Sequence, residues 1–143
     1  MSLPYQYMPE RLSLSKKERL CSRVLIDELF SGGKSVSCFP IRIVYRLYAG
    51  SESASDVSVL FNVSKKHFKR AVRRNRVKRQ FREMYRHSRE QVVNAVRSNG
   101  CSMTMAVVFC DDRLWNSELL SLSFDRALDK LMSRISSFSE DAQ

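Results

Sequence analysis

The stretch "RRNRVKRQFRE", from Arg73 to Glu83, constrains the fold of this chain more than any other feature. Six of its eleven residues are Lys or Arg, yet Val77 and Phe81 stand four apart among them. Residues four apart share one face of an α-helix, an arrangement that a disordered basic tail does not need. The stretch therefore predicts a helix with one apolar face on a core and a cationic remainder, although neighbouring cations repel by a few tenths of a kcal/mol.

The net charge of the chain, +10, is concentrated around this helix. Residues 64–90 hold twelve Lys or Arg and two acids, whereas the remaining 13 basic and 13 acidic residues cancel. Such an imbalance is typical of a polyanion-binding surface, because Lys and Arg release the counterions condensed on phosphates. A solvated charged face is the alternative without function, and a membrane-surface helix would need more bulky apolar residues.

Length and composition favour one domain over residues 1–143, with an ordered core at about 11–135 and flexible ends at 1–10 and 136–143. The chain has no run of about 18 apolar residues and no secretory signal, so we expect a cytoplasmic protein. The cysteines, Cys21, Cys38, Cys101 and Cys110, do not form the close pairs of zinc or redox motifs. We expect reduced structural thiols and no metal site.

The patterns predict the element order α-β-β-β-α-β-α. A first helix starts between Ser15, in the capping box "SKKE", and Ser22, and it ends at Phe30 before two glycines. A short strand, a break at Pro40 and a longer strand occupy residues 34–48; a loop at 49–56 and a strand at 57–63 follow. The basic helix spans about 71–96, a strand spans 101–110, and a last helix begins at Asn116 or Ser117 and precedes a frayed tail.

On a helical wheel, the basic helix has an apolar stripe made of Val77, Phe81, Met84, Ser88, Val92 and Ala95, with Tyr85 at its edge. Its N-terminus carries Lys69, Arg70, Arg73 and Arg74, where cations oppose the helix dipole. Bound phosphate reverses this cost, because free amides, dipole and guanidinium groups then converge on one anion.

Two other functions are possible for a chain with such a helix: a protein nuclease and a sequence-specific DNA-binding protein. A protein nuclease would need clustered carboxylates for metal ions or two histidines as acid and base, but Asp111-Asp112 does not accompany the basic segment in sequence. His67 falls in a connection and His87 on the exposed basic face, so no catalytic residue is assigned. A DNA reader would show more base-reading amides than Asn75 and Gln80.

The motifs "SKK" at Ser64 to Lys66 and "AVRRNRVKRQFRE" at Ala71 to Glu83 resemble the signature of the bacterial ribonuclease P protein component. The segment "RLCSRVLIDELFSGGKSV" resembles that family's first helix and glycine turn, so the resemblance covers about residues 11–135. It implies an α+β, two-layer sandwich with a four-stranded sheet and a left-handed β-α-β crossover, an exception to the usual hand. Ribosomal-protein second-domain-like folds and domain IV of elongation factor G are similar.

The resemblance implies a protein subunit that binds the catalytic RNA of ribonuclease P and the 5′ leader of precursor tRNA. It would assist endonucleolytic leader removal as a monomer, one per RNA, without a cofactor of its own; Mg²⁺ would act through the RNA. A ribosomal or other structural RNA-binding protein is the alternative. The expected RNA-binding residues are Lys65, Lys66, Lys69, Arg70, Arg73, Arg74, Asn75, Arg76, Lys78, Arg79, Arg82 and Arg86.

The family also holds the single-stranded leader in a cleft between the sheet and the first helix. Phe30 and Tyr45 match aromatic positions of that cleft, and Lys65 would lie near the substrate strand. Without the resemblance, Phe30 and Tyr45 would be core residues. One turn before Phe30 stands Ile26, where relatives often have Phe; a missing stacking platform would cost about 1–3 kcal/mol of binding.

Overall fold

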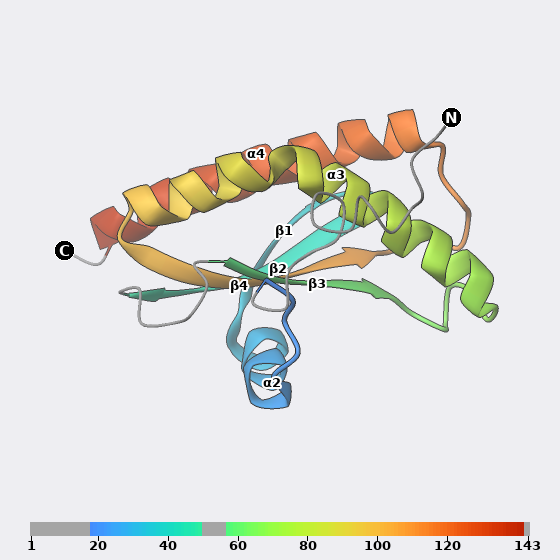
Figure 1. Cartoon of the computed structure of the whole chain (residues 1–143), viewed down its shortest axis with the longest axis horizontal. Helices are drawn as coiled ribbons and strands as arrows, with labels where there is room; N and C mark the ends of the chain where they lie inside the picture. The colour runs from blue at the N-terminus through green and yellow to red at the C-terminus, as the bar shows by residue number, and fades with distance from the viewer. Residues whose placement is uncertain (1–17, 50–56, 142–143) are drawn as a thin grey trace, which may run out of the picture.

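A four-stranded mixed sheet in the order β1-β2-β4-β3 lies in the middle of the molecule (Figure 1). The computed structural model describes residues 18–49 and 57–141. Strand β1 pairs with β2 and β2 with β4, both antiparallel, whereas β3 and β4 are parallel. The strands are β1 (Lys34–Cys38), β2 (Ile41–Ala49), β3 (Val57–Val63) and β4 (Cys101–Phe109).

Two long helices cover one face of this sheet, and a short helix packs on the other (Figure 1). Helices α3 (Ala71–Ser98) and α4 (Ser117–Asp141) lie side by side, while α2 (Arg23–Gly32) contacts β2 and β4 from below. The predicted α+β class and element order are confirmed, with α3, α4 and the sheet as the two layers. The β3-α3-β4 unit joins parallel neighbours, as expected; its left hand stays a prediction.

The apolar stripe of α3 differs in detail from the predicted one. Its buried residues are Val77, Phe81, Tyr85, Val92 and Val96. Tyr85 is 1% exposed and contacts Phe61 of β3 edge to face, so it belongs to the centre of the stripe and not to its edge. Met84, Ser88 and Ala95 are only half-buried, because the seam between α3 and the sheet follows Phe81 and Tyr85.

Helix α2 begins at the later of the two expected starts. Ser22 is its N-cap and accepts a 3.4 Å hydrogen bond from the amide of Leu25, whereas the Ser15 alternative lies outside the described residues. The helix extends two residues past the predicted end, to Gly32. Gly33 ends it by close approach: a Cβ there would lie 2.3 Å from the Leu29 carbonyl oxygen and 2.9 Å from that of Tyr45.

The alternation predicted for β2 separates two cores. Ile41, Ile43 and Tyr45 belong to the main core under α3 and α4, whereas Val44 packs with Leu29 of α2 on the opposite face. The break between β1 and β2 contains Pro40, as expected. The expected loop at 49–56 lies outside the described residues from position 50 onwards.

The last helix begins at the predicted cap and is longer than expected. Asn116 accepts a 2.7 Å hydrogen bond from the Glu118 amide through Oδ1. Apolar residues at helical spacing are buried against the sheet: Leu120, Phe124, Leu128, Leu131 and Ile135. The helix continues to Asp141, past the start of the expected tail. These elements bring the N-terminal end of α3 and the turn after β4 to the same end of the sheet, because Val63 pairs with Phe109.

Candidate nucleic-acid interface

The basic residues of the β3–α3 connection and of α3 face solvent. Nine of the twelve Lys and Arg residues in 64–90 are exposed, and Arg74, Lys78 and Arg86 are half-buried. Lys65, Lys66, Lys69 and Arg70 lie on the connection, and Arg73, Arg76, Arg79 and Arg82 continue along the helix. We call all twelve Lys and Arg residues of 64–90, including Arg89, the basic surface.

Acidic neighbours neutralise only two of these twelve cations in the described part of the chain. Glu83 accepts a 2.5 Å bond from Arg86, and Glu18 pairs with Arg89. The bond from Arg86 holds the pKa of the Glu83 carboxyl below its usual value, so this acid stays charged at neutral pH. The other cations have no carboxylate partner within the described residues, which is the arrangement expected of a surface that binds a polyanion.

Arg74 has a structural role that the sequence did not indicate. Its Nη1 donates 2.8 Å hydrogen bonds to the carbonyl oxygens of Phe68 and Lys69. The Phe68 ring is buried and stacks on Phe109, so Arg74 fastens the connection to the core as well as adding charge.

The N-terminus of α3 has the composition expected of an anion-binding end. Arg70 is the N-cap but makes no side-chain capping bond, and the first turn contains no acid. Free amides and the positive end of the helix dipole therefore face the same side as the nearby cations. Asn75, also predicted to contact RNA, is exposed on the second turn.

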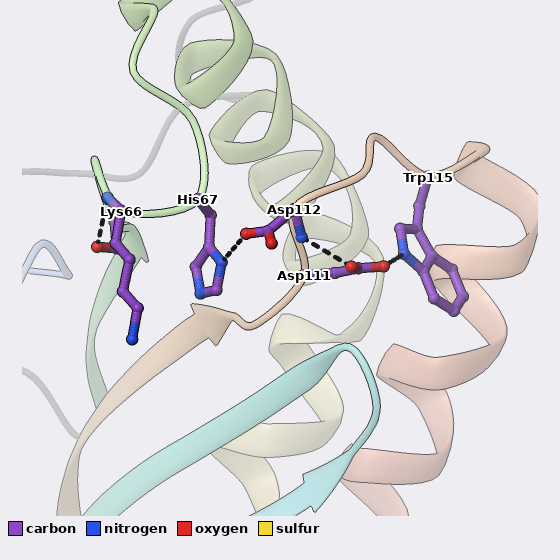
Figure 2. Close-up of polar contacts among 6 residues, drawn as sticks. Lys66, His67, Asp111, Asp112 and Trp115 are labelled. Carbon is purple, nitrogen blue, oxygen red and sulfur yellow. Dashed lines mark hydrogen bonds and ion pairs between the residues drawn. The ribbon is translucent and has the colours of Figure 1, made fainter.

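A hydrogen-bonded pair joins the β3–α3 connection to the turn after β4, as Figure 2 shows. His67 Nδ1 lies 2.6 Å from Asp112 Oδ1, although the two residues are 45 positions apart in sequence. Asp112 therefore does lie beside the basic segment in space, which corrects the expectation drawn from sequence proximity. The pair positions the connection that carries Lys65 and Lys66. The only feature of the sequence that could have indicated this contact was the unexplained Asp111-Asp112 doublet.

The same turn is anchored to the basic helix. Asp111 Oδ2 accepts a 2.7 Å bond from the Trp115 indole, and this bond lowers the pKa of the Asp111 carboxyl (Figure 2). Gln80 of α3 donates to the Trp115 carbonyl at 3.0 Å and to Ser117 Oγ at 2.9 Å. Because its amide is engaged inside the protein, Gln80 is unsuited to read bases, which weakens the DNA-reader alternative.

One of the three residues predicted for a leader cleft, Tyr45, lies on the wrong face of the sheet. Phe30 is 46% exposed on α2, and Lys65 is exposed after β3. Tyr45 is 3% exposed and packs in the main core, on the face of the sheet away from α2. It therefore cannot line a cleft between α2 and the sheet, whereas Ile26 packs in the α2 cluster.

Acidic, histidine and cysteine side chains lie scattered over the described residues. No three His, Cys, Asp or Glu side chains gather there into a cluster that could hold a metal ion. All four cysteines are free, and burial raises the pKa of the Cys101 and Cys110 thiols. No helix in residues 18–49 or 57–141 has the length and apolar character to span a membrane.

Known proteins match the chain over most of its length. The model of the Ribonuclease P family matches residues 14–135. A ribonuclease P protein component from Porphyromonas gingivalis is 39% identical over 128 residues, 89% of each chain, and one from Chlorobium phaeobacteroides is 34% identical over 108 residues, 71% and 74% of the two chains. The Staphylococcus aureus RNase P protein structure shares the fold, with TM-score 0.60 and 18% identity over 81% of this chain and 96% of its own.

Proposed function

The chain belongs to the ribonuclease P protein family, and we propose that its basic surface docks on the catalytic RNA of that tRNA-processing enzyme. The observation that carries the proposal is the row of exposed cations Arg73, Arg76, Arg79 and Arg82 on α3, none of which pairs with an acid within the described residues. A rigid helix presents these groups at fixed spacing, so the backbone does not have to be ordered when phosphates bind.

The protein's contribution is electrostatic. A catalytic RNA and a precursor tRNA repel each other through their phosphates, and cations at their junction reduce this repulsion. Arg residues outnumber Lys residues on the basic surface by eight to four, which suits planar, bidentate phosphate contacts. Arg76 and Arg79 are exposed on the helix and free of carboxylate partners within the described residues, so they are the central contacts.

Breaking of the phosphodiester bond is assigned to the RNA. His67 bonds Asp112, and His87 lies 3.2 Å from Glu83, so the two histidines do not face each other across one substrate position. Magnesium ions for the reaction would be held by the RNA, whose phosphate oxygens are ligands that Mg²⁺ prefers. The protein would act as one copy per catalytic RNA.

The 5′ leader would lie on the α2 face of the sheet. Phe30 offers a ring for base stacking there, and Lys65 lies where β3 ends. Tyr45 is removed from this proposal because it faces the opposite core. Leader contact would be weaker than in a relative with Phe at position 26.

Reconstitution tests the proposed function. Bacterial ribonuclease P RNA and precursor tRNA are mixed at low Mg²⁺ with and without the protein, and removal of the leader is followed on gels. We expect faster leader removal with protein present and none with protein alone. A His67→Ala/His87→Ala variant should still support cleavage at saturating concentration.

Two results would contradict the proposal. Leader removal that is unchanged by the protein, combined with retention of the protein on ribosomes, would favour a structural RNA-binding role. Cleavage by the purified protein alone, lost in the histidine variant, would place the chemistry in this chain.

A further inference from the structure

A cavity of about 300 Å³ opens at the sheet end remote from the N-terminus of α3. Its walls are the end of α2, the β2 segment Tyr45 to Leu47, and Arg134 of α4. It forms because β1 begins at Lys34, which pairs with Tyr45, while β2 continues along β4 as far as Ala49. Within the described residues, the outer edge of β2 beyond Tyr45 therefore has no strand partner.

Three cations and no acid are among the described residues that line this cavity. They are Lys34, Arg46 and Arg134. In the described part of the chain, none of the three forms an ion pair with a carboxylate. Three like charges around one small cavity are unfavourable in the free protein and become favourable when an anion occupies it.

Arg46 is held in position for such an anion. Its Nη1 donates to the Glu28 carbonyl at 3.4 Å, and its guanidinium lies 5.3 Å from the centre of the Tyr48 ring. Gly32 makes room for it, because a Cβ at that position would come within 3.2 Å of Nη1. The guanidinium is thus preorganised, which reduces the entropy lost on binding.

The opposite wall combines a cation with apolar surface. Arg134 lies close enough to the Tyr45 phenol to lower its pKa, against the larger raising effect of burial. Tyr45 and Leu47 supply apolar surface beside the charges. A volume of this size is at the lower end of small-molecule sites.

We propose that this cavity binds one nucleotide, its phosphate held by Lys34, Arg46 and Arg134 and its base against the partly exposed Leu47. The nucleotide is either free or part of a single-stranded RNA; the phosphate and base are common to both. The site is separate from the basic surface, since Leu47 and Val63 pair with β4 residues six positions apart. That separation is roughly 20 Å, beyond the screening length of about 8 Å at physiological salt.

Calorimetric titration of the full chain with uridine 5′-monophosphate tests the site. Arg134→Gln removes one phosphate contact from an exposed helical position with little change in helix propensity, and Lys34→Gln removes another. Arg126→Gln, two turns earlier on α4 and also exposed, is the matched control. We expect Arg134→Gln and Lys34→Gln each to weaken binding about tenfold or more and Arg126→Gln to leave it unchanged.

Further measurements locate the site and distinguish a free nucleotide from one in single-stranded RNA. Amide chemical shifts of Gly32 and Gly33 should change on titration, and Arg76→Gln/Arg79→Gln should bind the nucleotide as the wild type does. A uridine tetranucleotide that competes supports an RNA source, and one that does not compete supports a free nucleotide. Three results would overturn the proposal. The nucleotide could bind Arg134→Gln as tightly as it binds the wild type, or its binding could be lost in Arg76→Gln/Arg79→Gln. Inorganic phosphate could also bind as tightly as the nucleotide.

Discussion

At the scale of single residues, the contact between His67 and Asp112 is one that neighbouring sequence could not indicate. It joins the connection that carries the first basic residues to a turn that Asp111, Trp115 and Gln80 anchor on α3. The connection is therefore fixed at both ends, by His67 toward the turn and by Arg74 toward the helix. These two contacts hold the backbone of the connection, and with it the positions of its lysines, in place.

A double-mutant cycle measures the free energy that the contact between His67 and Asp112 contributes to stability. His67→Ala, Asp112→Ala and the double variant are unfolded in urea, and we expect a coupling free energy of about 0.5–1 kcal/mol, because Asp112 is largely exposed. His67→Ala combined with Asp129→Ala, an exposed acid of α4, should be additive. Additivity of the His67 and Asp112 changes would show that the contact contributes nothing to stability.

Glu83 is one of the two acids that pair with cations of the basic surface, so its removal should strengthen RNA binding. Glu83→Gln releases Arg86 from the 2.5 Å ion pair and adds one net positive charge. We expect catalytic-RNA affinity to rise and the plot of log K against log salt to steepen by up to about 0.9. Glu118→Gln on α4 is the control and should change neither; weaker binding by Glu83→Gln would contradict a purely electrostatic role.

At the scale of elements, the end of α2 depends on a backbone contact that only glycine permits. Gly33→Ala would place a Cβ 2.3 Å from the Leu29 carbonyl oxygen, and backbone cannot move away as a side chain can. We expect a loss of about 1–3 kcal/mol in the free energy of unfolding, measured in urea. Gly32→Ala, whose Cβ would meet only the end of the Arg46 side chain, should cost far less; equal losses would refute the explanation.

Local patterns predicted the elements well because each rests on neighbouring residues. The cap at Asn116, the break at Pro40 and the apolar period of the basic helix are all short-range features. The alternation in β2 also placed Tyr45 and Val44 on opposite sides correctly. It could not say which side faces the first helix, because that depends on packing between distant segments, and the leader cleft was misassigned for this reason.

At the scale of the whole molecule, the positive charge is distributed unevenly and does not contribute to the stability of the fold. The core is formed by residues such as Phe81, Tyr85 and Phe109, and the cations add repulsion without burying apolar surface. Within the described residues, nine of the twelve cations in 64–90 have neither an acid partner nor the structural bonds of Arg74. A phosphate backbone is the partner that makes this arrangement favourable.

The salt dependence of catalytic-RNA binding tests this claim most directly. Arg76→Ala/Arg79→Ala removes two charges from the basic surface, and Arg23→Ala/Arg126→Ala removes the same number from exposed positions on α2 and α4. We predict that the first variant binds more weakly and that the slope of log K against log salt decreases in magnitude by about 1.4–1.8, while the second retains the wild-type slope. An unchanged slope in Arg76→Ala/Arg79→Ala, or an equal decrease in both variants, would contradict docking through this helix.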